Sequence, residues 1–265
     1  MFERKNRILL KELVKTDFKL RYQGSVIGYV WSILKPLLLF AVMYIVFVRF
    51  LRFGQDVPHF AVALLLGMVL WNFFTETTNL GMMSIVSRGD LLRKLSFPTE
   101  IIVISISINA LINLVISFVI VFIFGLVNQV DVSSYAFFAP LLLIELFAFS
   151  LGVSFILASI YVKFRDIGPI WEVLLQVGMY MTPLIYPVTL VMNKDLFIAK
   201  LLMLNPMAQI IQDMRYLLTS PVNVTTWQLI NNKPVVMIPY IIPFIVLIIG
   251  FKIFKKNSKR FAEII

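Results

Sequence analysis

Residues 101–127 read IIVISISINALINLVISFVIVFIFGLV and contain no charged side chain. A helix needs about 20 mainly apolar residues to cross the hydrocarbon core of a bilayer, so this stretch is long enough to span a membrane. The whole chain of 265 residues agrees, since 60% of the residues are hydrophobic and 14% are charged, whereas an average soluble domain is roughly 45–50% apolar. This composition excludes an ordinary soluble domain, a disordered tail and a nucleic-acid-binding tail.

Five other windows of similar length are bounded by charged or turn residues. They cover residues 30–51, 60–86, 135–162, 170–190 and 235–254. The window 60–86 is the least regular, because its part from Trp71 to Asn79 includes polar residues that must face protein or water rather than lipid. We therefore expect an all-α membrane protein in which residues 1–265 form a single domain with six transmembrane helices.

Basic residues are distributed unequally between the segments that connect these windows. Seventeen Lys and Arg residues lie in residues 1–23, 87–100, 163–169 and 252–265, whereas the opposite connecting segments contain six. Basic connecting segments are retained on the cytoplasmic side. The sequence therefore predicts a multi-pass protein of the cytoplasmic (inner) membrane with both termini inside.

The N-terminal segment, residues 1–29, is amphipathic. In a helix, its leucines lie near one face and lysines spaced by four lie on another: Leu9, Leu13, Leu20, Lys11, Lys15 and Lys19. This pattern predicts a helix in the cytoplasmic membrane interface, held by burial of the leucines and by anionic lipid headgroups. A generic juxtamembrane anchor is the alternative interpretation.

Residues 87–98 form a short, basic and amphipathic segment that Pro98 ends before the next span. A small cytoplasmic helix is expected here. It is either a positively charged topology anchor or a docking surface, and exposed apolar side chains bordered by charge favour the docking surface. The candidate docking residues are Arg88, Leu91, Leu92, Arg93, Lys94, Leu95 and Phe97.

Residues 191–234 contain an apolar run from Leu196 to Leu204 that is too short to cross a bilayer. Prolines interrupt the chain on both sides of this run, at Pro187 and Pro206. A short apolar run between helix breakers favours outer re-entrant helices packed on protein. A loosely packed extracellular loop is the alternative, although side chains such as Leu201 have no reason to sit in water.

Enzymatic motifs are absent from the sequence. No phosphate loop and no Gly-x-Gly-x-x-Gly motif occur, so we expect no nucleotide site and no cofactor in this chain. The chain has no cysteine and a single histidine, His59, which excludes a thiolate or His-rich metal site. The intramembrane carboxylates Glu76, Glu145 and Glu172 are isolated in sequence, and each is open to a functional role or to a hydrogen bond with a neighbouring helix. These features predict a permease rather than an enzyme.

Aromatic residues make up 14% of the chain, and several lie in the predicted spans. Rings with a polar tip offer flat apolar contact and one hydrogen bond, which suits the C–H faces of sugars. A conduit for a long polar chain needs many weak contacts of this kind. The candidate channel residues, for which ordinary helix packing is the alternative role, are Tyr29, Trp31, Tyr44, Trp71, Phe73, Phe74, Glu76, Trp171, Tyr180 and Tyr186.

Four stretches of the sequence resemble parts of one transporter family. They are Lys19–Leu37 (KLRYQGSVIGYVWSILKPL), Lys163–Ile167 (KFRDI), Thr182–Pro187 (TPLIYP) and Leu204–Met207 (LNPM). In order and in separation these stretches are similar to permeases of the ABC-2 type that export cell-surface polysaccharides, namely O-antigen, capsule or teichoic acid.

The resemblance implies a homodimer of six-helix subunits bound to two copies of a separate ABC ATPase, which would bind ATP and Mg. A lipid-linked polysaccharide would pass through a channel between the two permeases. The resemblance implies contact of the protein with membrane lipids, and it implies no nucleic-acid partner. Residues 87–98 would be the coupling helix seated in a groove of the ATPase, and the outer re-entrant helices would gate the exit. Arg165 and Asp166 match a cytoplasmic Arg-Asp pair of the family, with a role either in coupling or only in holding their loop.

Two other functions remain open from the sequence. The nearest keeps the fold and changes the cargo to a drug or a small lipid. A membrane-embedded glycan-modifying enzyme is more remote, because it requires Glu76, Glu145 and Glu172 to converge on a metal ion.

Overall fold

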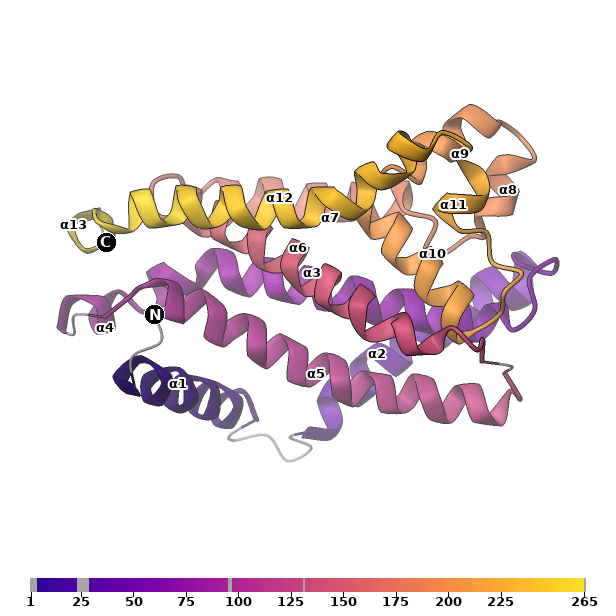
Figure 1. Ribbon diagram of the computed structural model, residues 1–265. Helices are drawn as coiled ribbons and strands as arrows, with labels where there is room; N and C mark the ends of the chain where they lie inside the picture. The colour runs from indigo at the N-terminus through magenta and orange to yellow at the C-terminus, as the bar shows by residue number, and fades with distance from the viewer. Residues whose placement is uncertain (1–3, 23–28, 95–96, 131, 265) are drawn as a thin grey trace.

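The computed structural model describes residues 4–22, 29–94, 97–130 and 132–264, and the regular structure of these residues is helical throughout (Figure 1). The all-α prediction is therefore confirmed for the described part of the chain. The helices in chain order are α1 (Arg4–Tyr22), α2 (Tyr29–Met43), the π-helical η1 (Tyr44–Phe50), α3 (Phe60–Ser87), α4 (Gly89–Lys94), α5 (Glu100–Val127), the 3-10 helix η2 (Ala136–Phe138), α6 (Ala139–Tyr161), α7 (Ile167–Met181), α8 (Val188–Met192), α9 (Leu196–Leu202), α10 (Pro206–Leu218), α11 (Thr226–Leu229), α12 (Lys233–Ser258) and α13 (Phe261–Ile264).

Four helices of the described residues are long and apolar enough to cross a membrane: α3, α5, α6 together with η2, and α12. They coincide with the predicted spans 60–86, 101–127, 135–162 and 235–254. The predicted span 30–51 corresponds to α2 and η1, which follow each other without a break and include the shorter apolar helix Pro36–Phe50. This architecture supports four of the six predicted spans by length and composition.

The boundary of the fifth predicted span, 170–190, is wrong. Helix α7 has 15 residues and ends at Met181, which gives it a length of only about 22 Å. Thr182 has an extended backbone with φ −98° and ψ 133°. The physical reason lies in the next residue, because Pro183 disfavours helical geometry at the residue before it. The apolar residues that follow belong to a turn and to α8 rather than to a continuous span.

Helix α3 is the central helix of the bundle. In its most apolar window of 18 residues 72% of the residues are buried, against 22% in the corresponding windows of α5 and α12. Helices α5, α6 and α7 all pack against it. Part of its polar second half faces protein: Thr77 and Thr78 are fully buried, and the Thr78 hydroxyl donates to the Phe74 carbonyl at 2.8 Å.

Helices α6 and α12 approach each other closely at two glycines. A β-carbon on Gly152 would lie 2.6 Å from the backbone nitrogen and 2.7 Å from the α-carbon of Leu247. A β-carbon on Gly250 would clash with the carbonyl oxygen of Gly152. Small residues at a crossing let two helix backbones meet, which is how helices gain packing contact inside a membrane.

The two ends of the bundle differ in character. The start of α1, the short helix α4 and the C-terminus lie together at one end, called the α4 end, while α8, α9 and α11 lie at the other, called the α9 end (Figure 1). Helix α1 packs against α5 and is held by an ion pair between Asp17 and Arg88. Leu9 and Leu13 of α1 are half-buried, whereas Leu20 is exposed, so the predicted apolar face is only partly covered by protein.

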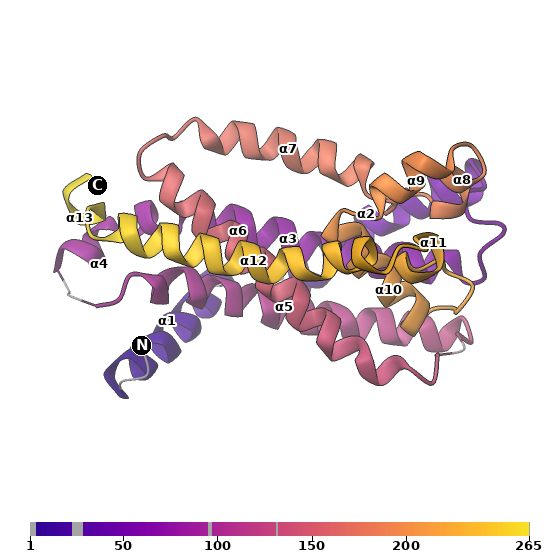
Figure 2. The ribbon, with the colours of Figure 1, turned by 45° about the horizontal axis from the view of Figure 1, so that its top comes forward.

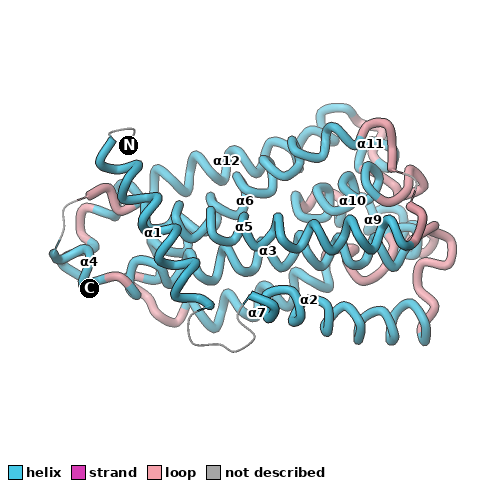
Figure 3. Tube along the Cα trace, turned by 90° about the horizontal axis from the view of Figure 1, so that it is seen from below, coloured by secondary structure: helices cyan, strands magenta, loops and turns pink. Residues whose placement is uncertain are grey.

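Helices α2 and α7 lie along the same edge of the bundle (Figure 3). From another side, α7 stands apart from the α6 and α12 pair along most of its length (Figure 2). Both helices carry exposed apolar side chains, and these are Leu38, Leu39 and Val42 in α2 and Ile170, Val173, Leu174 and Val177 in α7. Apolar side chains of both helices are therefore left uncovered by the described part of the chain along this edge.

Candidate functional site

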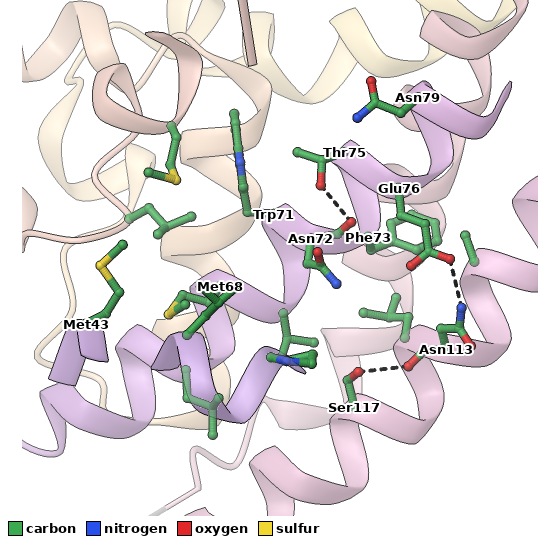
Figure 4. Close-up of a pocket in the computed structure, with 18 of the residues that line it drawn as sticks. Met43, Met68, Trp71, Asn72, Phe73, Thr75, Glu76, Asn79, Asn113 and Ser117 are labelled. Atoms are coloured by element: carbon green, nitrogen blue, oxygen red, sulfur yellow. Dashed lines mark hydrogen bonds between the residues drawn. The ribbon is translucent and has the colours of Figure 1, made fainter. Parts of the chain in front are cut away.

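A cavity of about 760 Å³ lies between α2, α3, α5 and the end of α7 (Figure 4). Its wall combines aromatic rings with amide and hydroxyl groups and one carboxylate. The polar and aromatic side chains of the wall are Trp31, Trp71, Asn72, Phe73, Thr75, Glu76, Asn79, Asn113 and Ser117. Apolar side chains of α2, α3, α5, α7 and the turn after α7 complete it. This is the candidate functional site.

Helical spacing brings the polar groups of α3 to the cavity. Asn72, Glu76 and Asn79 are four and three residues apart, so they follow one face of the helix. Asn113 of α5 donates its side-chain amide to the Glu76 carboxylate at 2.8 Å across the cavity wall. Ser117 follows one turn later on α5 and donates to the Asn113 carbonyl at 2.9 Å. The polar strip is therefore built where α3 and α5 face each other.

The chemistry of this wall suits a neutral hydroxylated ligand. Amides, hydroxyls and a carboxylate both donate to and accept from hydroxyl groups. The rings of Trp71 and Phe73 offer flat apolar contact beside them. Glu76 is the one charged side chain among the described lining residues.

The structure brings four of the predicted channel residues to this cavity, namely Trp31, Trp71, Phe73 and Glu76. Phe74 and Trp171 instead join helices to each other. The Phe74 ring stacks on Phe149 of α6, with centroids 5.3 Å apart and an interplanar angle of 8°. The Trp171 indole nitrogen of α7 donates to the Thr78 hydroxyl of α3 at 3.1 Å.

Tyr44, Tyr180 and Tyr186 lie outside the cavity wall. The Tyr44 hydroxyl accepts from the Arg49 guanidinium at 3.1 Å within η1. The Tyr186 hydroxyl donates to the Tyr180 carbonyl at 3.0 Å, and the Tyr180 side chain itself is exposed. The side chain of Tyr29 falls outside the described part of the structure.

The three intramembrane glutamates do not converge. Glu76 lines the cavity, Glu145 is buried beside α10, and Glu172 is exposed on α7. A metal site that depends on all three is therefore incompatible with this arrangement of the helices.

The predicted docking segment forms α4 at the α4 end. Arg93 and Lys94 are exposed there, and Leu91 is half-buried. Leu92 and Phe97 are half-buried against an apolar cluster that includes Ile85 and Phe254, so their burial inside the chain limits the apolar surface that the sequence predicts for docking. Leu95 falls outside the described residues.

Arg88, Arg165 and Asp166 are the remaining predicted coupling residues. Arg88 is engaged inside the chain, because it pairs with Asp17 and donates to the Ser105 hydroxyl at 3.4 Å. Arg165 and Asp166 are exposed before α7. The Arg165 guanidinium lies 5.2 Å from the centroid of the Tyr161 ring, a distance typical of a cation–π contact.

Arg215 of α10 is a structural centre that sequence reasoning missed. Its side chain is 1% exposed and donates to the carbonyl oxygens of Ala63 at 2.9 Å, Pro183 at 2.7 Å and Leu184 at 2.5 Å. Burial lowers the pKa of the guanidinium to about 9, so the group stays charged at neutral pH. Because Leu184 belongs to the cavity wall, Arg215 fixes that wall to α3 and α10.

Comparison with known proteins places these features in context. A family model described as ABC-2 type transporter matches residues 8–219. The O-antigen export system permease protein RfbA of Myxococcus xanthus is 32% identical over 205 residues, which cover 77% of each chain. Two proteins of the same name from Klebsiella pneumoniae are each 28% identical, over 263 and 261 residues, and these alignments cover 97% of this chain and 95% of theirs.

Proposed function

Because the chain belongs to the ABC-2 type transporter family, we propose that it is the transmembrane permease subunit of an exporter for a lipid-linked cell-surface polysaccharide. The observation that carries this proposal is the similarity to O-antigen export permeases over 97% of the chain. The family and these relatives are transport proteins, so the chain is a transporter subunit and not an enzyme.

The cavity supports a glycan as the transported chain. Its aromatic, amide and hydroxyl groups suit sugar rings. Many weak contacts are what a moving polymer requires, since tight binding would hold it in place. In this proposal the sugar chain passes the cavity while the phosphates and the lipid stay closer to the bilayer.

A second copy of the chain would complete the pathway. The cavity is walled by Trp31 and Met43 from α2 and by Met179 from α7, the two helices along the exposed apolar edge. A second permease placed against this edge would cover that apolar surface and enclose the cavity in a channel between two subunits. An apolar edge alone also suits contact with lipid, whereas an apolar edge beside a polar cavity favours a homodimer.

Energy would come from a separate ATPase, in two copies, that binds ATP and Mg and docks at the α4 end. Exposed Arg93 and Lys94 there offer a positively charged contact, which requires this end to face the cytoplasm. ATP-driven closure of the ATPase would tilt α4 and shift the permease between two states. Transport would have a direction only if the glycan interacts differently with the two states, because a ligand that binds both states equally does not shift the equilibrium between them.

The test is the double substitution Arg93→Glu with Lys94→Glu. We expect it to abolish copurification of the ATPase and polysaccharide export, while leaving membrane insertion unchanged. Lys256→Glu with Lys259→Glu is the matched control, because it makes the same charge change at exposed positions of the same end. Normal copurification and export by the Arg93 and Lys94 variant would show that the docking assignment is wrong. Reconstituted permease and ATPase that fail to move a lipid-linked polysaccharide into vesicles would contradict the cargo.

A further inference from the structure

A cluster of buried polar side chains joins three helices towards the α9 end. It consists of Glu145 from α6, Gln209 and Asp213 from α10, and Tyr240 from α12, and we call it the Glu145–Asp213 cluster. The exposed fractions of Glu145, Gln209 and Asp213 are 5%, 0% and 9%. Helix α10 contacts both α6 and α12, and Figure 1 shows it beside them at this end.

Hydrogen bonds connect the members of this cluster. The Gln209 amide nitrogen donates to Asp213 Oδ2 at 2.9 Å, and the Tyr240 hydroxyl donates to the same oxygen at 2.5 Å. Gln209 and Asp213 are one turn apart on α10, and the Gln209 amide also neighbours Glu145. Hydrogen bonds therefore join α10 to α12 at Asp213, and Glu145 of α6 lies close to Gln209.

Three buried oxygen atoms of the cluster have no hydrogen-bond donor: Glu145 Oε1, Gln209 Oε1 and Asp213 Oδ1. A buried acceptor without a donor is costly, and two ionised carboxylates in one buried place also repel each other. The buried cation on the same helix does not neutralise them, because Arg215 is engaged by the carbonyls of Ala63, Pro183 and Leu184. The cluster therefore has unpaired oxygen acceptors, on two carboxyl groups and one amide, that suit a small cation.

We propose that the Glu145–Asp213 cluster is a binding site for one monovalent cation, a proton or a sodium ion, which it takes up when α10 docks against α6 and α12. Carboxylate and amide oxygens are ligands for hard cations or for a shared proton. A calcium ion would need six to eight oxygens, and no group of three or more His, Cys, Asp or Glu residues able to hold a metal ion occurs among the described residues.

The environment of Asp213 agrees with this site. Burial raises the pKa of its carboxyl from 3.8 to about 6, although the hydrogen bonds from Tyr240 and Gln209 oppose the rise. The folded protein then holds a proton that the unfolded chain releases between these two values. Stability from this proton falls as the pH rises through the window and is lost above about pH 6, unless another cation takes its place. The site is independent of the cargo, so it stands or falls separately from the proposed function.

The experiment measures the thermal unfolding of the full chain in lipid nanodiscs between about pH 4.5 and about pH 8. Two solutions of equal ionic strength are compared, one with sodium chloride and one with N-methylglucamine chloride. If the occupant is a proton, the folding equilibrium constant falls by up to about tenfold for each pH unit as the pH rises to about 6, and it does so in both solutions. If it is sodium, sodium chloride raises the unfolding temperature at about pH 8 and N-methylglucamine chloride does not.

Glu145→Gln and Asp213→Asn remove the negative charge from the cluster. Each is expected to abolish the dependence seen in the wild type, whereas Glu263→Gln, at an exposed carboxylate of α13, retains it. The site is refuted if the wild type shows neither a pH nor a sodium dependence beyond that of the two variants. If the variants do not fold, hydrogen–deuterium exchange of the wild type replaces them. Protection of α10 must then change with pH or sodium more than that of α5, and equal changes overturn the proposal.

Discussion

Replacement of Arg215 by methionine tests how the cavity wall is held. The arginine links α10 to the carbonyl of Ala63 in α3 and to the carbonyls of Pro183 and Leu184 after α7. Methionine is long enough to fill much of the same space but donates no hydrogen bond. In the Arg215→Met variant three buried carbonyl groups lose the hydrogen bond from the guanidinium, and the turn that follows α7 loses its hydrogen bonds to α10.

The expected cost follows from these three contacts. A hydrogen bond to a charged group contributes about 1.5–3 kcal/mol, and a buried acceptor left without a donor costs about 1–3 kcal/mol. Removal of the buried charge also ends its desolvation penalty, which offsets part of the loss. We expect Arg215→Met to lower the free energy of unfolding by roughly 3–6 kcal/mol. The stability of Arg215→Lys should lie between that of the wild type and that of Arg215→Met, because an ammonium group can donate hydrogen bonds but cannot reproduce the planar fork of arginine.

The assay is unfolding of the purified permease in mixed micelles, together with hydrogen–deuterium exchange of residues 182–187. Arg260→Met is the matched control, since Arg260 is exposed and its loss should change stability by less than about 0.5 kcal/mol. The reasoning fails if Arg215→Met and Arg260→Met unfold alike, or if residues 182–187 keep their full protection in the Arg215 variant.

Two further substitutions test the packing of the bundle. Gly152→Ala should lower the free energy of unfolding by about 2–3 kcal/mol, because its methyl group would meet the backbone of Leu247 at 2.6–2.7 Å. The control Gly125→Ala, whose methyl group meets Val62 at 4.0 Å, should be neutral or stabilising. Equal losses of stability for the two variants, measured by unfolding in micelles, would refute this reasoning. Asp17→Arg places two cations together, so it should release α1 from α5 and increase the proteolysis of α1. The double variant Asp17→Arg with Arg88→Asp should restore the protection of α1. If the single variant is cleaved no faster than the wild type, this ion pair does not hold α1.

The apolar windows of the sequence predict four helices of the fold well, because length and hydrophobicity decide whether a segment can span. The error at 170–190 arose because a hydrophobic window does not register a break in the helix. Leu184 and Ile185 are as apolar as the residues of α7, but they lie in a turn flanked by Pro183 and Pro187. The proline positions indicate this break, whereas the apolar content does not.

Part of the candidate site could be predicted from the sequence. Phe73 and Glu76 are three residues apart on one helix, so helical spacing alone brings them close together. Asn113 could not be found in the same way, because its contact with Glu76 depends on how α5 packs against α3. The same holds for Arg215, which the sequence presents as an ordinary basic residue of an outer segment.

The burial of α3 explains why its sequence is the least regular of the spans. A helix that faces lipid must be apolar all around, whereas a helix surrounded by protein can place amides and hydroxyls against partners and cavities. Thr78 receives a hydrogen bond from Trp171 of α7, and Glu76 receives one from Asn113 of α5. Polar residues in this span therefore do not weaken its assignment as a membrane helix. They mark it as the helix around which the others are arranged, and so as the place where a polar passage can be built.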